Sequence, residues 1–166
     1  MIRPAHPDEL PLLASIEAAA AQKFRGTPME FILSFPKKPL HAMRIPQAVR
    51  IWVACNVADV PIGFLEAETI ENWLHILEIS VLPGEQRKGH ARALIDAARE
   101  EARRNNLESL SLTTDRELPW NGPAYKRMGF SELPPEQAPA WLQEILVHEF
   151  SLGFDPARRI AMVRHP

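Results

Sequence analysis

The clearest pattern of apolar and polar positions lies in the middle of the chain. Residues 74–81 form an apolar run that predicts a buried strand, and Pro83-Gly84 marks a turn after it. A short basic loop follows, and apolar residues then recur with the period of a helix. The apolar positions of that helix are Ala91, Leu94, Ile95, Ala98 and Ala102. This stretch therefore predicts a strand, a loop and a helix, with residues 87–89 where the helix begins.

The first part of the chain reads as a strand followed by helices. Residues 2–5 are short and extended enough for an edge strand, and Pro7 with two acids after it is typical of a helix start. The apolar stripe of that helix comprises Leu10, Leu13, Ile16, Ala20 and Phe24. Residues 28–33 are expected to form a second short helix. Residues 50–57 and 62–70 predict strands, which with 74–81 make an antiparallel meander.

The remaining segments continue this alternation of helices and strands. Residues 107–114 predict a strand, and a strand, helix and strand in this order form a crossover that makes the two strands parallel neighbours. Asn121 is expected to cap a short helix that Gly129 ends, and a strand follows at 130–133. A late helix at 140–152 and a last strand at 159–163 complete the chain.

Composition narrows the class of protein. The chain has 166 residues, of which 46% are apolar and 24% charged, so a single domain over residues 1–166 is expected. A net charge of −2 does not favour nucleic acid or an anionic membrane as a partner. One cysteine allows neither an internal disulfide nor a cysteine metal cluster, and the histidines lack ligand spacing, so we expect no metal. Without a signal segment or an apolar membrane span, a cytoplasmic protein is the default prediction.

The start of the central helix has the properties of an anion site. The first N–H groups of a helix have no intrahelical acceptor, and the helix dipole adds partial positive charge there. Gly89 would let a phosphate approach the backbone, and Arg87, Lys88 and Arg92 add formal charge. A P-loop is ruled out because His90-Ala91 follows Gly89 in place of Lys and Ser or Thr. A solvated basic turn is the alternative.

Two motifs resemble one family. The segment Gln86-Arg87-Lys88-Gly89-His90-Ala91 resembles the pyrophosphate-binding signature Q/R-x-x-G-x-G/A of the GNAT superfamily of acetyl-CoA-dependent N-acetyltransferases. Further on, residues 125–130 resemble the family's Y-x-x-x-G-F, in which the tyrosine lies near the sulfur of coenzyme A. Tyr125 is the only tyrosine in the chain. The order of the predicted elements is similar to the family's over the whole chain.

The resemblance implies both a fold and an activity. The fold is of the α/β (α+β) class, a mixed and mostly antiparallel sheet of about seven strands with a parallel pair in the middle and helices on both faces. The activity is transfer of an acetyl group from the co-substrate acetyl-CoA to a primary amine, by direct attack in a ternary complex. The residues implied to bind acetyl-CoA are Ile79, Val81, Gln86, Arg87, Lys88, Gly89, His90, Ala91, Arg92 and Asn121. A non-catalytic CoA-binding regulatory or interaction domain and an acyltransferase acting on a protein amine remain alternatives.

The sequence also departs from the family. The family often has an asparagine seven residues before the tyrosine, where Leu118 stands here, and Asn121 lies only four before it. Residues 134–154 are longer than a plain hairpin and resemble an insertion that covers either the acceptor site or a partner in a dimer. The protein is accordingly expected to be a monomer or a homodimer.

The chemistry that the resemblance implies needs a base, an oxyanion site and an acid. A primary amine is mostly ammonium at neutral pH and must lose a proton before it attacks a thioester. Glu78 and His75 are the candidate bases; three positions apart on a strand, they point to opposite faces unless a bulge intervenes. The backbone N–H of Val81 is our candidate for the oxyanion, and Tyr125 for the acid or the hydrogen-bond donor to sulfur. Thr113 on the neighbouring strand is a candidate to position substrate or water.

Charged side chains elsewhere in the sequence do not identify the acceptor amine. Lys37-Lys38 is interpreted as a solvated pair, and Arg158-Arg159 as a surface pair beside Asp155. No strongly acidic cluster in the sequence points to a polycationic acceptor, so a small amine is the expected substrate.

Overall fold

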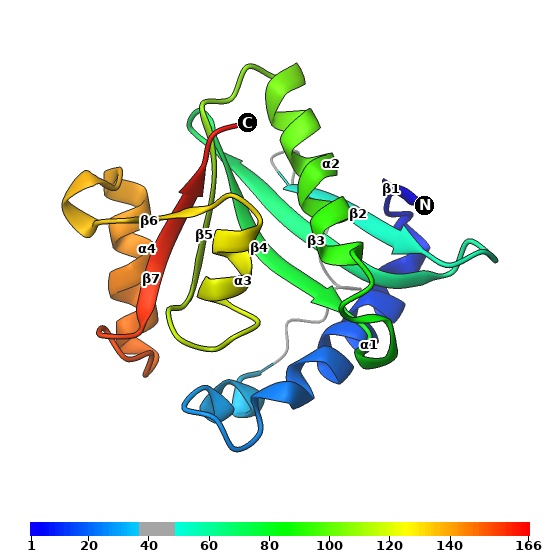
Figure 1. Cartoon of the computed structure of the whole chain (residues 1–166), viewed down its shortest axis with the longest axis horizontal. Coiled ribbons are helices and arrows are strands. Elements are labelled where there is room, and N and C mark those ends of the chain that lie inside the picture. Colours follow the sequence, from blue (N-terminus) through cyan, green and yellow to red (C-terminus); the bar gives the residue numbers. More distant parts are fainter. Residues whose placement is uncertain (37–48) are drawn as a thin grey trace.

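The computed structural model of the chain describes residues 1–36 and 49–166. Its strands form one sheet in the order β1-β2-β3-β4-β5-β7-β6 (Figure 1). The strands are β1 (Ile2–Pro4), β2 (Val49–Cys55), β3 (Pro61–Ile70), β4 (Trp73–Val81), β5 (Ser109–Asp115), β6 (Ser131–Leu133) and β7 (Arg159–Arg164). The α-helices are α1 (Leu10–Ala21), α2 (His90–Arg104), α3 (Gly122–Arg127) and α4 (Ala140–Ser151). Short 3-10 turns comprise η1 (Pro7–Glu9), η2 (Gln22–Phe24), η3 (Glu30–Ser34), η5 (Pro83–Glu85) and η6 (Pro135–Gln137).

The sheet confirms the predicted architecture. Seven strands are mixed, the pair β4 and β5 is parallel, and the other neighbouring pairs in this sheet are antiparallel. The expected second helix near residues 28–33 is the 3-10 turn η3, and the expected helix start at Pro7 is the 3-10 turn η1, which leads directly into α1. The prediction for Lys37-Lys38 lies outside the described residues.

One face of the sheet is covered by α2 and α3. The predicted stripe on α2 buries Leu94, Ile95, Ala98 and Ala102, each with none of its surface exposed. Tyr125 of α3 belongs to the same core. Removing a leucine or isoleucine side chain from water contributes about 1.5–3 kcal/mol, so this stripe holds α2 firmly against the sheet. The beginning of α2 is thereby fixed beside the end of β4.

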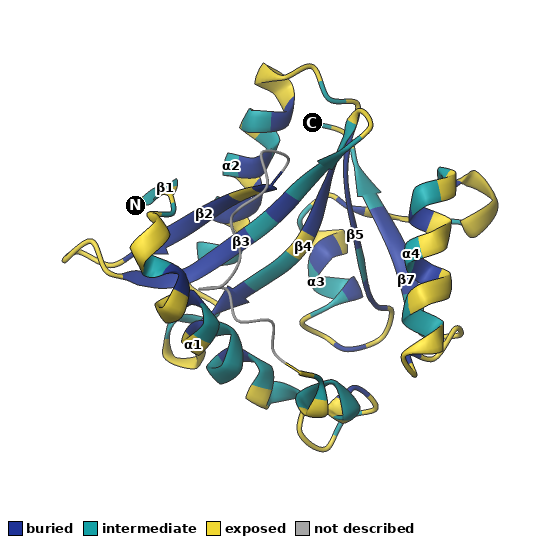
Figure 2. Cartoon of the chain, turned by 180° about the vertical axis from the view of Figure 1, so that it is seen from behind, coloured by how far each residue is buried: buried dark blue, intermediate teal, exposed yellow. Residues whose placement is uncertain are grey.

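The opposite face is covered by α1 and α4 (Figure 2). Leu13 and Ile16 of α1 pack against Phe64 of β3, and Leu142 of α4 packs against Ala161 of β7. The two helices cover different halves of this face, and the diverging ends of β4 and β5 lie between them in Figure 2. None of the helices in the described part of the chain is long and apolar enough to cross a membrane.

Candidate active site

The site forms where the two parallel strands part. β4 and β5 are paired only at Trp73 with Ser109, Leu74 with Leu110 and His75 with Ser111. Beyond these pairs β5 continues along β7, and β4 continues along β3. Figure 1 shows the two strands separating toward their C-terminal ends.

Backbone N–H groups on β4 face the opening between the strands. The Leu82 N–H donates to the carbonyl oxygen of Ile62 at 2.9 Å. Along an antiparallel strand, successive backbone N–H groups point alternately toward the paired strand and away from it. Because the Leu82 N–H points toward β3, the N–H groups of Ile79 and Val81 point away from β3 and toward the opening. The Val81 carbonyl already accepts a hydrogen bond from the Gln86 side chain at 3.0 Å. Two of the predicted binding residues thus present backbone donors there, and Gln86 ties the loop to the strand.

The loop before α2 leaves a run of backbone N–H groups available. The first bond into the helix runs from the Ala93 N–H to the Gly89 carbonyl at 3.0 Å. Within the described residues, no backbone carbonyl accepts from the N–H groups of residues 87–92. Arg87 and Gly89 have φ of 62° and 89°, in the left-handed region. A Cβ atom on Gly89 would meet no atom within 4 Å, so the space above the loop is open.

The basic side chains of the loop have different surroundings. Lys88 pairs with Glu85 at 3.0 Å, and the hydrogen bond from Lys88 is the main cause that lowers the pKa of Glu85. His90 lies 3.6 Å from the same carboxylate. Arg92 donates to the carbonyl of Arg127 in α3 at 2.9 Å. The formal charge of the loop is therefore partly balanced, and the backbone donors and the helix dipole are its more constant source of positive potential.

Tyr125 and Asn121 come from α3 and its start. Tyr125 is buried, lines a cavity, and packs edge to face on Phe130 with ring centroids 5.8 Å apart. Burial, and then the negative charge of Glu78, raise the pKa of Tyr125, so its phenol stays protonated. Asn121 occupies the predicted N-cap position, but its side chain does not cap: Nδ2 donates to Thr114 Oγ1 at 2.9 Å. Its Oδ1 is buried with no partner among the described residues.

Tyr125, Asn121 and Ile79 line a cavity of about 700 Å³. Its lining includes β4 residues that point to either face of the sheet, Ile76 and Ile79 to one and Glu78 and Ser80 to the other. The described polar and charged residues that line it are Glu17, Lys23, Glu66, Glu68, Glu78, Ser80, Thr113, Thr114, Asn121, Tyr125 and Arg159. Its apolar wall includes Phe24, Met29, Ile32, Phe35, Trp120 and Phe154. Two of these aromatic rings, Phe24 and Trp120, contact each other edge to face.

A bulge in β4 decides where the two candidate bases point. Opposite Glu66 and Ala67 of β3 stand Glu78 and Ile76 of β4, which leaves Leu77 as an extra residue. Glu78 and His75 therefore point to the same face of the sheet, which is the exception that was expected for an intervening bulge.

The two candidates nevertheless differ in access. Glu78 lines the cavity, burial raises its pKa, and the Ser80 hydroxyl donates to its Oε1 at 2.6 Å. His75 does not line the cavity: its Nδ1 lies 2.9 Å from Ser111 Oγ, and its ring packs on Trp141. Burial lowers the pKa of His75 to about 4. The geometry therefore favours Glu78 as the group that meets a substrate.

The remaining predicted residue, Thr113, belongs to a charged network. Its Oγ1 donates to Glu149 Oε1 at 2.8 Å, and Arg159 holds both oxygens of the same carboxylate at 2.7 and 2.8 Å. Arg159 lies 4.2 Å from the ring centroid of Phe154. The interpretation of Arg158-Arg159 as a surface pair was wrong, because both guanidinium groups are mostly buried and hold carboxylates.

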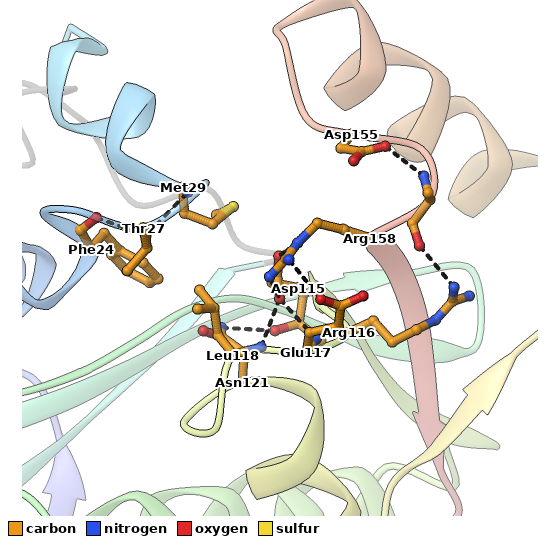
Figure 3. A network of polar contacts seen from close by, with 12 residues as sticks. Phe24, Thr27, Met29, Asp115, Arg116, Glu117, Leu118, Asn121, Asp155 and Arg158 are labelled. Atoms are coloured by element: carbon orange, nitrogen blue, oxygen red, sulfur yellow. Dashed lines mark hydrogen bonds and ion pairs between the residues drawn. The ribbon is translucent and has the colours of Figure 1, made fainter.

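Asp115, at the end of β5, is the centre of a second network (Figure 3). Its carboxylate accepts two hydrogen bonds from Arg158, at 2.8 and 2.9 Å. Its Oδ1 also accepts hydrogen bonds from the backbone N–H groups of Glu117 and Leu118, both at 2.8 Å. Burial opposes ionisation, but these hydrogen bonds outweigh it and lower the pKa of Asp115. The network fixes the loop in which Leu118 joins the hydrophobic cluster of Met29 and Phe154, and this loop leads to Asn121 at the cavity.

Sequence reasoning missed the carboxylates that surround the cavity. Glu17, Glu66 and Glu68 join Glu78 there, although the sequence shows no acidic cluster. A signal existed in β3, where Glu66 and Glu68 alternate with the buried Leu65 and Ala67 and so share one face. The approach of Glu17 depends on how α1 packs. No group of three or more His, Cys, Asp or Glu in the described ranges is placed to hold a metal ion.

Comparison with known proteins identifies a family and a fold for this chain. The model of the acetyltransferase (GNAT) family matches residues 16–130. A GNAT-family acetyltransferase from Staphylococcus aureus Mu50 shares 14% identity at a TM-score of 0.75, over 99% of this chain and 98% of that one. The PaiA N-acetyltransferase of Thermoplasma acidophilum, solved with coenzyme A, shares 16% identity at a TM-score of 0.75, over 100% and 98%. The ribosomal-protein-S18-alanine N-acetyltransferase of Escherichia coli shares 18% identity at a TM-score of 0.69, over 99% and 92%.

The chain belongs to the GNAT family of acetyltransferases, because the family model spans more than half of it. The solved structures show that the fold is the GNAT fold.

The first prediction concerns the Asp115 network. Asp115→Asn is expected to lower the free energy of unfolding by about 2–3 kcal/mol at neutral pH, because it leaves Arg158 without its charged acceptor. The folded pKa of Asp115 is depressed, so its stabilisation is present above the unfolded pKa of about 3.9 and is lost as the pH falls through the folded value. Urea unfolding at several pH values measures both effects. The exposed Asp8→Asn is the control, and equal stability of the two variants at neutral pH would contradict the network's role.

Proposed function

We propose that the protein is an N-acetyltransferase that moves the acetyl group of acetyl-CoA to a primary amine. The observation that carries the proposal is one cavity lined by a half-buried carboxylate and a protonated phenol, with free backbone N–H donors on the adjoining strand and helix start. The donors belong to β4 and the start of α2, the carboxylate is Glu78, and the phenol is Tyr125. Family membership and the coenzyme A complex of the Thermoplasma protein support acetyl-CoA as donor.

The two substrates approach from opposite faces of the sheet. The beginning of α2 lies on the face that α2 and α3 cover, so a diphosphate bound to N–H groups of residues 87–92 enters from that side. The arm of the carrier then follows the opening between β4 and β5, where Ile79 and Val81 offer N–H donors to its amide and carbonyl oxygens. The carboxylate of Glu78 lies on the α1 face. The acceptor amine therefore reaches the thioester from the α1 side, which permits direct attack in a ternary complex.

Three groups of this chain serve the chemical step. Glu78 accepts a proton from the acceptor ammonium, directly or through water, so that the nitrogen lone pair becomes available. The Val81 N–H donates to the carbonyl oxygen as negative charge develops there during formation of the carbon–nitrogen bond. Tyr125 donates a hydrogen bond or its proton to the sulfur as the carbon–sulfur bond breaks. The products are an N-acetyl amide and the free thiol of coenzyme A.

Binding of the diphosphate is tested at Gly89. Gly89→Glu is expected to weaken coenzyme A binding by more than about a hundredfold in calorimetry. The substitution places a carboxylate in the open space over the loop and strains a residue at φ +89°. Gly84→Glu is the matched control, since Gly84 is also open but needs no positive φ, and it should bind nearly as the wild type. Gly89→Ala separates strain from charge. Unchanged affinity in Gly89→Glu would contradict the assignment of the loop.

The base is tested by the pH dependence of turnover. Only ionised Glu78 accepts a proton, so kcat/KM is expected to fall as the pH drops through its raised pKa. Glu78→Gln is expected to lower kcat by about a hundredfold or more and to remove this acidic limb, with little change in coenzyme A affinity. The exposed Glu136→Gln should behave as the wild type. A Glu78→Gln enzyme that keeps both its rate and its acidic limb would show that another group is the base.

The role of Tyr125 is tested by removing only its hydroxyl. Tyr125→Phe preserves the packing on Phe130 and is expected to lower kcat by about tenfold or more while acetyl-CoA affinity changes less than about threefold. Thiol release under saturating substrates and calorimetry give the two numbers. The same kcat for both forms would remove the acid role.

A further inference from the structure

On the α1 side, where the acceptor amine is proposed to enter, the cavity carries more acidic residues than the sequence indicates. Glu17 comes from α1, Glu68 from β3 and Glu78 from β4, and all three line the same 700 Å³ space. Glu66 lines it too and has an interaction of its own. Four carboxylates from three elements thus border a single cavity.

The register of the strands sets the spacing of these groups. Glu66 stands opposite Glu78, and Glu68 stands opposite His75, so the three glutamates share one face. Two residues along a strand span about 7 Å, which is the separation of Glu68 from the Glu66–Glu78 pair along the strand direction. A cation bound between Glu68 and Glu78 would interact favourably with both carboxylates.

The described cations that line the cavity form no salt bridge with Glu17, Glu68 or Glu78, although Lys23 interacts electrostatically with Glu78. Of the two described cations that line the cavity, Arg159 is already held by both oxygens of Glu149. The other is Lys23, whose pKa is lowered mainly by burial and which forms no ion pair with a described residue. In the described ranges no residue pairs with Glu17 or Glu68. Among the described residues, no cation competes with a ligand for these two carboxylates.

The cavity wall carries a separate sign of a ligand. Asn121 Oδ1 is buried and has no hydrogen-bond donor in the described part of the chain, although its Nδ2 is bonded to Thr114. Buried polar atoms in native proteins nearly always have partners, so this oxygen is suited to accept a ligand's N–H. The aromatic rings of Phe24 and Trp120 provide an apolar wall for methylene groups beside these polar atoms.

We propose that the acceptor is an aliphatic diamine or polyamine. The reacting nitrogen lies at Glu78, and a second ammonium group is held by Glu68 and Glu17 at the outer part of the cavity. This inference rests on the proposed acetyltransferase function and names its substrate class. The sequence alone shows no acidic cluster, because the acidic groups that favour a polycation come together only in the fold.

The test compares two acceptors that differ only in the second nitrogen, diaminobutane and butylamine. Thiol release is measured for the wild type, for Glu68→Gln and for the exposed control Glu136→Gln. We expect kcat/KM for diaminobutane to exceed that for butylamine by about tenfold or more in the wild type and the control. Glu68→Gln should remove this preference through a higher KM for diaminobutane, while butylamine is unaffected. Added salt should reduce the preference, since part of it is electrostatic.

The outcomes separate this inference from the proposed function. Acetylation of both amines with equal kcat/KM overturns the diamine assignment and leaves the acetyltransferase standing. Acetyl-CoA binding without thiol release for either amine overturns both, and points to a coenzyme A sensor. Calorimetry of each amine in the presence of coenzyme A measures acceptor binding without turnover. If butylamine binds as tightly as diaminobutane, the diamine assignment is also overturned. Glu17→Gln provides a second variant if Glu68→Gln does not fold.

Discussion

The separation of β4 from β5 is the constraint on which the rest of the site depends. Only three residue pairs join the two strands, and they also join the two halves of the sheet. Beyond His75 and Ser111, β4 remains paired with β3 and β5 remains paired with β7, so both strands stay regular where they separate. The separation releases the N–H groups of Ile79 and Val81 from the ladder and leaves room for the cavity that residues of both strands line. A fully paired β4 and β5 would have neither.

Several neighbouring contacts hold this opening in a fixed geometry. The bulge at Leu77 turns Glu78 to the side of the sheet where the acceptor is proposed to bind. The ion pair of Asp115 with Arg158 fixes the end of β5, and Arg159 with Glu149 fixes β7 to α4. On the other side, α2 is held by a stripe of buried residues, so the free amides at its start have a constant position relative to β4. Preorganised donors of this kind cost no rearrangement when charge develops on a substrate.

Local patterns in the sequence predicted most of the fold and part of the site. Periodicity and turn residues predicted the seven strands and the four helices to within a few residues, because each depends on neighbours in the chain. The positions of Gly89 and Tyr125 followed from two short motifs. The bulge was not predicted, because one extra residue in an apolar run leaves the run apolar. That single residue reverses the side to which Glu78 points relative to His75.

Long-range contacts account for the rest. Glu17 is about 50 residues from Glu68 in the sequence, and only the packing of α1 on the sheet brings both to the cavity. The pairing of Arg159 with Glu149 and of Arg158 with Asp115 likewise depends on how α4 and β5 flank β7. The spacing of charged residues in the sequence does not show which of them pair in the fold and which remain solvated.

The central claim is that the opening between β4 and β5 and the start of α2 together hold one thioester carrier. A crystal structure of the protein with acetyl-CoA tests it most directly. The account predicts diphosphate oxygens about 3 Å from backbone nitrogens of residues 87–92, and the acetyl-bearing arm between β4 and β5 beside Val81 and Tyr125. A diphosphate bound elsewhere on the protein, or an arm lying outside that opening, would contradict it.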